Sequence, residues 1–468
     1  LPPVITKRER CVETVSILIR HARIVDPSRQ LDRVGDLLIG SGEITAAGRL
    51  GPDRIPDGCR VIDGTGLVAS PGFIDLHCHV RGPGFEYKET IAAGSKAAAK
   101  GGFTTLCAMP NTDPPVDNAA VVDFIHQIAR RDSLVRILPI GCVTKGRKGH
   151  ELAEMEELAS AGVVAFSDDG DPVYDANLMR LALIYSLDLG LPISNHCQER
   201  SLSCNGVMAE GPVATHLGLD GIPAAAEETM IARDIALAEA TGGRLHVAHL
   251  STAGSVPLVR EAKSRGLSVT AEVCPHHLTT TDQWVLGRKG EPTTAAGGLA
   301  YDTSTKVYPP LRGQRDVDAL IQGLADGVID CVATDHAPHD LTSKQVTYQE
   351  AAFGISVLET ALGSMLQLVH SKKLSIGAMI DRLTTGPARV LGESYSDLAS
   401  LQPGTTADIV LFDPEQEWTV DTAEFESKGR NTPLEGTTLK GRVVATFASG
   451  NLIYQSAGLK FEEPHVRA

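Results

Sequence analysis

Two histidines with the spacing of metal ligands follow a short apolar segment near residue 70. Phe73, Ile74 and Leu76 form the apolar run, and His77-Cys78-His79 stands at its end. Because residues i and i+2 of a strand point to the same face, both imidazoles could contact one metal ion. Arg81 continues this alternation, so we expect a guanidinium just beyond the metal, where it can bind a carboxylate in a forked geometry.

Further imidazoles and carboxylates follow apolar segments later in the chain. They are Asp168-Asp169, His196, His249 and Asp335. This donor set suits zinc or a similar divalent ion. It is too large for one tetrahedral site, and its size fits two ions that share a carboxylate and a water. The sequence therefore predicts a binuclear metal centre.

The elements that position these residues alternate between strand and helix from residue 67 onward. We expect eight strands, near residues 73–77, 104–109, 135–140, 163–166, 191–196, 244–249, 267–273 and 328–335. Such alternation is typical of a parallel sheet, and eight repeats predict an α/β fold of the (β/α)8 TIM-barrel type. In such barrels, the site lies at the carboxyl ends of the strands, which is where these polar residues are found.

Short strands separated by turn residues come before and after this region. They predict a small β-sandwich domain built from both chain ends, with residues 1–66 and 396–468 flanking a barrel of residues 67–395. A Gly- and Thr-rich stretch at about 280–305 is long for a connecting loop and is predicted to be a lid.

Composition limits the partners. The net charge of -15 argues against nucleic acid and against an anionic membrane surface. No run of about 18 apolar residues predicts a membrane span, and the N-terminal residues lack the apolar core of a signal peptide. The nine cysteines are scattered without a CxxC pair, which is typical of reduced thiols in the cytoplasm.

Several other polar residues receive plainer interpretations. His246 lies an odd number of residues from His249 and is predicted to face the core, and Asp168 is read as a turn carboxylate. Lys306 and Arg312 are as compatible with the surface as with a site. His276, His277 and His336 are predicted to be structural or to support the site from outside, and His277 could approach a substrate. A solvated helix start is predicted for Glu86, Lys88 and Glu89.

Taken together, these segments resemble the dihydroorotase family of the amidohydrolase superfamily, in the type whose bridging ligand is an Asp. The resemblance runs from about residue 15 to 456. The motifs that carry it are Gly72–Arg81, Gly101–Thr105, Met109–Thr112, Phe166–Gly170, Asn195–Cys197, His246–Thr252, Cys274–Leu278, Pro309–Arg312, Ala333–His339, Ala352–Gly354 and Leu358–Thr360.

This resemblance implies a role for each matched residue. One zinc ion would be held by His77 and His79 and a second by His196 and His249, with Asp169 as the bridge. Asp335 would bind the first ion and act as general base and acid. The residues implied to hold the substrate are Arg81, Asn111 and His339 for its carboxylate, and Phe353, Gly354 and the position of Tyr308 for its ring.

The implied reaction is the reversible cyclisation of N-carbamoyl-L-aspartate to L-dihydroorotate in pyrimidine (UMP) biosynthesis. The implied protein is a cytoplasmic homodimer, with association with aspartate carbamoyltransferase left open. Gly82 stands where the family usually has Glu, and Tyr308 where it usually has an Asn that contacts the substrate ring. Two alternatives remain: another cyclic-amide hydrolase, such as a hydantoinase or allantoinase, and a non-catalytic scaffold for aspartate carbamoyltransferase.

Overall fold

Strands from both ends of the chain form one sheet in the computed structural model, which describes residues 16–287, 300–459 and 461–462. The sheet has nine strands, in the order β17-β16-β15-β5-β1-β2-β3, with β4 pairing to β1 and β18. Their bounds are β1 Ile17–Asp26, β2 Leu31–Gly40, β3 Glu43–Gly48, β4 Arg60–Asp63, β5 Val68–Pro71, β15 Ile409–Thr419, β16 Thr438–Ala448, β17 Asn451–Gln455 and β18 Phe461–Glu462.

Apolar side chains from both ends of the chain share the core of this sheet. Ile24 and Leu37 pack in one buried cluster with Ile409 and Phe447. Strand β5 pairs in parallel with β1 and antiparallel with β15, so it joins the two halves. The division of the chain at residues 66 and 395 remains a prediction, and β5 lies just beyond the first limit.

The middle of the chain pairs in parallel. One sheet has the order β6-β7-β8 and another has the order β14-β13-β12-β9. Single parallel bridges join them: Phe166 pairs with Gly141 and with Ile193, and Cys78 pairs with His336. The pairings therefore return to their starting strand. The strands are β6 Phe73–Cys78, β7 Phe103–Ala108, β8 Arg136–Pro139, β9 Ile193–Asn195, β12 Leu245–Val247, β13 Val269–Val273 and β14 Cys331–Val332.

The strand predicted at residues 163–166 is reduced to these bridges at Phe166. The segment donates from Val164 N to Pro139 O and from Phe166 N to Pro192 O. Pro139 and Pro192 have no N–H to donate, which shortens the hydrogen-bond ladder on both sides of the segment. The remaining predicted strands are present, several of them shorter than expected.

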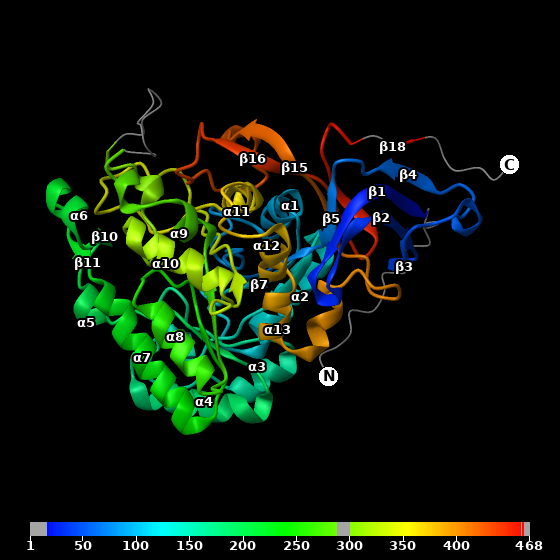
Figure 1. Ribbon diagram of the computed structural model, residues 1–468. Coiled ribbons are helices and arrows are strands. Elements are labelled where there is room, and N and C mark those ends of the chain that lie inside the picture. The colour runs from blue at the N-terminus through cyan, green and yellow to red at the C-terminus, as the bar shows by residue number, and fades with distance from the viewer. Residues whose placement is uncertain (1–15, 288–299, 460, 463–468) are drawn as a thin grey trace.

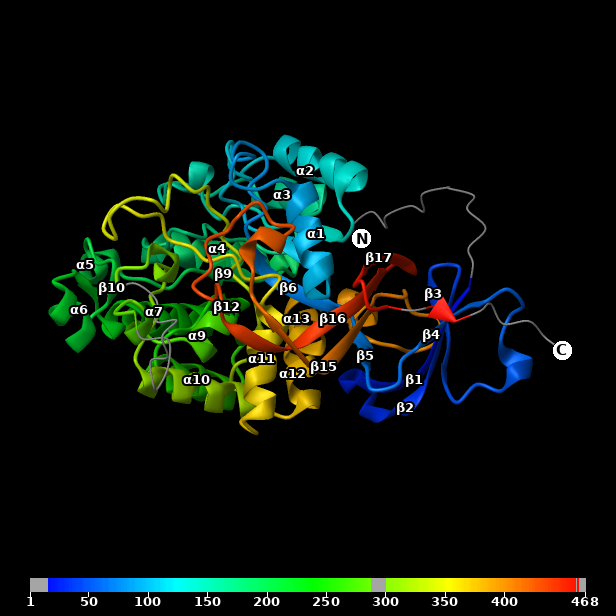
Figure 2. The same ribbon diagram turned by 90° about the horizontal axis from the view of Figure 1, so that it is seen from above.

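Helices follow most of these strands and cover their outer side (Figure 1). In both views, helices α4 to α10 lie on one side of the molecule and strands β1 to β4 on the other (Figure 2). The longer helices are α1 Ile91–Gly101, α2 Ala119–Asp132, α3 Met155–Ala161, α4 Ala176–Leu189, α7 Ala224–Thr241, α8 Ser255–Ser264, α10 Gln314–Ala325, α11 Ala361–His370, α12 Ile376–Leu383 and α13 Thr385–Leu391.

None of the helices in the described ranges is long and apolar enough to cross a membrane. The stretch predicted to be a lid lies partly outside the described residues, because 288–299 are not among them.

An ion pair joins the parallel strands to the terminal sheet. Asp408 is buried and accepts from Arg136 Nη1 at 2.9 Å and from Ser449 N at 2.7 Å. Asp408→Ala would leave both donors without this partner, and we expect it to lower the free energy of unfolding by about 2–3 kcal/mol. Denaturant unfolding of parent and variant measures the loss.

The matched control is Asp132→Ala, which removes the partner of Arg131 at the surface. Exposed ion pairs contribute little to stability, so the free energy of unfolding of this variant should be close to that of the parent. Equal losses in the two variants would contradict a special contribution from Asp408.

Candidate metal centre

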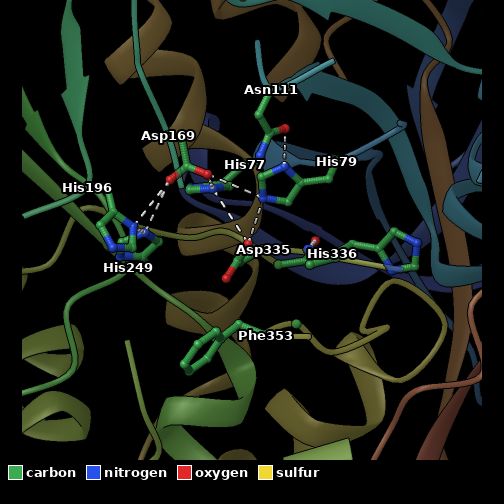
Figure 3. A network of polar contacts seen from close by, with 12 residues as sticks. His77, His79, Asn111, Asp169, His196, His249, Asp335, His336 and Phe353 are labelled. Carbon is green, nitrogen blue, oxygen red and sulfur yellow. Dashed lines mark hydrogen bonds and ion pairs between the residues drawn. The ribbon is translucent and has the colours of Figure 1, made fainter. Parts of the chain in front are cut away.

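The carboxylate of Asp169 lies between two pairs of histidines (Figure 3). Its Oδ2 is 3.3 Å from His77 Nε2 and 3.4 Å from His79 Nε2. Its Oδ1 is 3.6 Å from His196 Nδ1 and 3.4 Å from His249 Nε2. One oxygen thus faces each histidine pair, which is the arrangement of a carboxylate that bridges two ions.

Asp335 completes the first half of this cluster. Its Oδ1 is 3.0 Å from His79 Nε2 and 3.6 Å from His77 Nε2. Burial alone would raise the pKa of the Asp335 carboxyl, but its close contacts with His79 and His77 outweigh this effect, so the pKa lies below its usual value. Asp335 is therefore ionised near neutral pH and can accept a proton.

The far nitrogens of the first histidine pair are held by other side chains. His77 Nδ1 lies 2.8 Å from Glu272 Oε1, and His79 Nδ1 lies 2.8 Å from Asn111 Oδ1. Both acceptors require the N–H on Nδ1, which leaves each Nε2 lone pair directed at the cluster. Metal-binding histidines are commonly oriented in this way.

Glu272 also contacts a histidine outside the cluster. Its second oxygen contacts His246 Nε2 at 3.1 Å. Burial would raise the pKa of Glu272, but His77 and His246 lower it to about 2. His246 therefore faces away from the centre, in agreement with its predicted core position, and it still acts on His77 through Glu272.

Asp75 anchors the end of β14 to β6. It accepts from Thr334 N at 2.8 Å, from Thr334 Oγ1 at 2.5 Å and from His77 N at 3.2 Å. Asp335 follows directly with φ 46°, and His249 has φ 32°. Such left-handed values are costly for residues with side chains and are found mostly at functional sites. They turn both side chains toward Asp169.

The donor atoms fit divalent cations. His77 Nε2 and Asp169 Oδ1 are buried without a hydrogen-bond partner among the described residues. Buried polar atoms without partners are rare. Two sets of ligand atoms lie close together, His77-Asp169-His249 and His77-His79-Asp335. Imidazole nitrogens and carboxylate oxygens suit zinc and similar ions.

The residues predicted to bind a substrate carboxylate lie beside this cluster. Arg81 Nε donates to Pro338 O at 3.2 Å, and its Nη2 is 3.5 Å from His339 Nε2. Arg81 has φ 62° and lies beyond the end of β6. The prediction that strand alternation directs Arg81 was therefore wrong, because a turn positions this side chain. Asn111 contacts His79 through its side-chain oxygen.

The residues predicted near a substrate ring lie close together beside His196. Tyr308 stacks on His196 with ring centroids 4.8 Å apart and lies 4.9 Å from the Phe353 ring. His339 Nε2 is 2.8 Å from Phe353 O. Gly354 has φ +143°, and a Cβ there would lie 2.7 Å from Ala337 O, so glycine is required.

One of the plainer predictions was wrong, and for two residues that were left open the structure excludes a surface position. Glu89 is fully buried and accepts from Ser427 Oγ at 2.6 Å, so it does not belong to a solvated helix start. Lys306 and Arg312 are also buried, with their charges bonded to backbone carbonyls of Gln349 and Ile222. In each case tertiary contacts supply partners that the local sequence does not reveal.

Other plain predictions agree with the structure. Asp168 accepts from Val143 N, Thr144 N and Thr144 Oγ1, as a turn carboxylate does. The His336 ring points away from the cluster, and its Nδ1 accepts from Val357 N at 3.0 Å (Figure 3).

Glu272 was missed by the sequence analysis. Its signal was a charged residue inside a strand whose other residues are uncharged, Val269–Val273. Strands of a parallel sheet are buried on both faces, so a Glu there requires a partner.

Comparisons with known proteins agree with this geometry. A dihydro-orotase-like family model matches residues 66–255. The dihydroorotase of Pelotomaculum thermopropionicum is 50% identical over 442 residues, which cover 94% of this chain and 99% of that protein. That of Caldanaerobacter subterraneus subsp. tengcongensis is 49% identical over 453 residues, covering 96% and 100%.

Solved structures with the same fold are more distant in sequence. An L-hydantoinase (dihydropyrimidinase) from Arthrobacter aurescens superposes with a TM-score of 0.81 at 23% identity, covering 95% of this chain and 97% of that one. A dihydropyrimidinase from Brevibacillus agri gives a TM-score of 0.80 at 23% identity, covering 96% of each chain.

The contact between Glu272 and His77 generates a prediction. Glu272→Gln keeps the shape but removes the charge that orients His77, and loss of such a contact typically weakens metal binding about 10–100-fold. We expect this loss in zinc titrations of the metal-free protein.

The matched control is Glu359→Gln, a buried carboxylate that pairs with Lys100 outside the metal centre. Its zinc affinity should equal that of the parent. Unchanged zinc affinity in Glu272→Gln would show that His77 is oriented without this contact.

Proposed function

The chain belongs to the dihydroorotase family, and from this premise we propose that it is a zinc-dependent dihydroorotase of pyrimidine biosynthesis. It is a cyclic amidohydrolase, and its reaction is the reversible cyclisation of N-carbamoyl-L-aspartate to L-dihydroorotate. The observation that carries the proposal is the position of Asp169, with one carboxylate oxygen facing each histidine pair.

The residues that would hold two zinc ions are the six of this cluster. One ion would be bound by His77, His79 and Asp335, and the other by His196 and His249. Asp169 would bind both ions. Such a pair of ions, when bound, would lower the pKa of water to near neutrality and polarise the amide carbonyl.

Asp335 is placed to move the proton during hydrolysis. A water adds to the ring carbonyl carbon, and the ionised Asp335 accepts the proton that the water loses. The bond between this carbon and the ring nitrogen then breaks. Asp335 returns the proton to the departing nitrogen, which regenerates the Asp335 carboxylate and gives a urea N–H. The new carboxylic acid releases its remaining proton to solvent, which leaves a carboxylate.

Arg81, Asn111 and His339 would orient the substrate through its carboxylate. The Arg81 guanidinium is buried with its Nε on a backbone carbonyl, and part of its fork remains for an anion. Burial and the neighbouring Arg81 lower the pKa of His339 to about 2, so His339 is neutral. Phe353 and Gly354, with Tyr308, would contact the ring.

We further infer the finer features of fold and setting. The closed circuit of parallel pairings supports a (β/α)8 barrel, with the terminal sheet as a small β-sandwich domain. We propose that the protein is a cytoplasmic homodimer. We also propose that it binds neither nucleic acid nor membrane, and the net charge of -15 supports this second point. Association with aspartate carbamoyltransferase is compatible with this proposal.

The first test is hydrolysis of dihydroorotate by zinc-loaded protein. Asp335→Asn removes the proton acceptor, and we expect turnover to fall by at least about 10²-fold. The control is Asp326→Asn, which removes an exposed carboxylate paired with Arg260 and should leave turnover unchanged.

The zinc content of each preparation is measured alongside. Bound zinc without turnover in the parent would redirect the assay to hydantoins and allantoin. Neither zinc nor turnover would favour a non-catalytic scaffold for aspartate carbamoyltransferase.

The proposed reaction also has a fixed pH dependence. Carbamoyl aspartate carries two carboxylates and dihydroorotate one, so ring closure takes up a proton at pH values well above the carboxyl pKa of about 4. The equilibrium ratio of dihydroorotate to carbamoyl aspartate should fall about tenfold for each pH unit, because each unit lowers the proton concentration tenfold. Approach to equilibrium from both substrates at several pH values measures it, and a constant ratio would refute the assigned reaction.

A further inference from the structure

Three potential metal ligands outside the six-residue cluster meet at the end of β13. Cys274, His276 and His277 follow this strand and enter the short helix α9 Pro275–Thr279. All three side chains are buried. Each offers one ligand atom, and these atoms lie within 4.8 Å of one another. The proposed mechanism uses none of them.

The imidazole nitrogens of this group lack partners. Both ring nitrogens of His276 and Nδ1 of His277 are buried without a hydrogen bond to any described residue. Leaving a buried polar atom unsatisfied costs about 1–3 kcal/mol. Two of these atoms, Nδ1 of His277 and one of the two His276 nitrogens, carry a lone pair that a cation could accept.

His277 already has the orientation of a metal ligand. Its Nε2 lies 3.0 Å from Pro309 O, and a carbonyl can only accept, so Nε2 carries the proton. The Nδ1 lone pair is then free to bind. Burial lowers the pKa of His277 to about 4 and that of His276 well below its usual value, so both rings are neutral, as metal binding requires.

A second group with a thiol provides a contrast. His246, Glu272 and Cys331 also bring their ligand atoms together. There, His246 contacts Thr270 Oγ1 at 2.8 Å and Glu272 at 3.1 Å, and Glu272 contacts His77. The nitrogens of His246 and the carboxylate of Glu272 already have hydrogen-bond partners, so a cation would stabilise this group less.

We propose that Cys274, His276 and His277 form an additional binding site for a thiophilic divalent cation such as zinc or cadmium. One thiolate and two imidazoles are typical ligands for these ions, and three protein ligands leave a fourth position open. Burial and the charges of Asp335 and Glu272 raise the pKa of the Cys274 thiol. The thiol therefore loses its proton only when the cation binds.

Cobalt is the probe, because a thiolate bound to Co²⁺ gives a strong charge-transfer absorption in the near ultraviolet. The six-residue cluster contains no sulfur and cannot give it. Metal-free protein is loaded with excess Co²⁺ alone and its absorption and bound cobalt are measured. We expect the band in the parent, and in Cys274→Ser the loss of the band and of one cobalt per chain.

A second variant covers the case in which Cys274→Ser does not fold, which circular dichroism would reveal. His276→Asn keeps the thiol and removes one nitrogen, so the band should require at least tenfold more cobalt to reach half of its intensity. Dihydroorotate hydrolysis by both zinc-loaded variants should persist, which separates this site from the catalytic proposal.

Two matched controls remove other thiols. Cys331→Ser removes the thiol of the group with His246 and Glu272, and Cys204→Ser removes an exposed thiol. The band should survive in both. Absence of the band from the parent, its survival in folded Cys274→Ser, or its loss in either control would overturn the proposal.

Discussion

The centre of this protein depends on a carboxylate shared by four imidazoles. Asp169 is almost completely buried, and its two oxygens each face one histidine pair at 3.3–3.6 Å. These distances are longer than most charged hydrogen bonds, and two of the atoms, His77 Nε2 and Asp169 Oδ1, have no hydrogen-bond partner in the part of the chain that the structure describes. Such an arrangement is costly for a protein without cations and becomes favourable when ions occupy the gaps. The surrounding structure keeps the ligands in place.

Support for the ligands comes from carboxylates one step further out. Glu272 holds His77, Asp75 holds the backbone before Asp335, and Glu227 holds the turn after His249 by accepting from Ser251 and Thr252. Each of these acids is on a different strand or helix from the group it positions. The candidate metal ligands are therefore oriented by the packing of whole elements, which is why a rigid sheet of parallel strands suits them.

The loops that carry Tyr308 and Phe353 are connected by a buried lysine. Lys344 Nζ donates to Thr303 O at 3.1 Å, Lys306 O at 3.3 Å and Ala352 O at 2.6 Å. Burial and the neighbouring Lys306 lower its pKa to about 7. The two loops tied in this way lead directly to Tyr308 and Phe353, so this lysine holds together the segments that carry both rings.

The sequence by itself determined the chemistry of the site. The HxH pair, the Asp pair and the histidines after apolar segments identified the donor set, and their order along the chain identified the family, which relatives at 43–50% identity confirm. Periodicity sufficed because strand alternation and carboxyl-end placement are local rules. Local rules also located most strands, although two prolines shortened the strand predicted at 163–166.

Only the tertiary structure decided which partners the charged residues have. Glu272 and Glu89 are separated from His77 and Ser427 by 195 and 338 residues, and no local pattern links positions so far apart. Arg81 is aimed by a left-handed turn, not by strand alternation. The His276 nitrogens have no hydrogen-bond partner among the residues that the structure describes, and this likewise becomes visible only in the packed molecule.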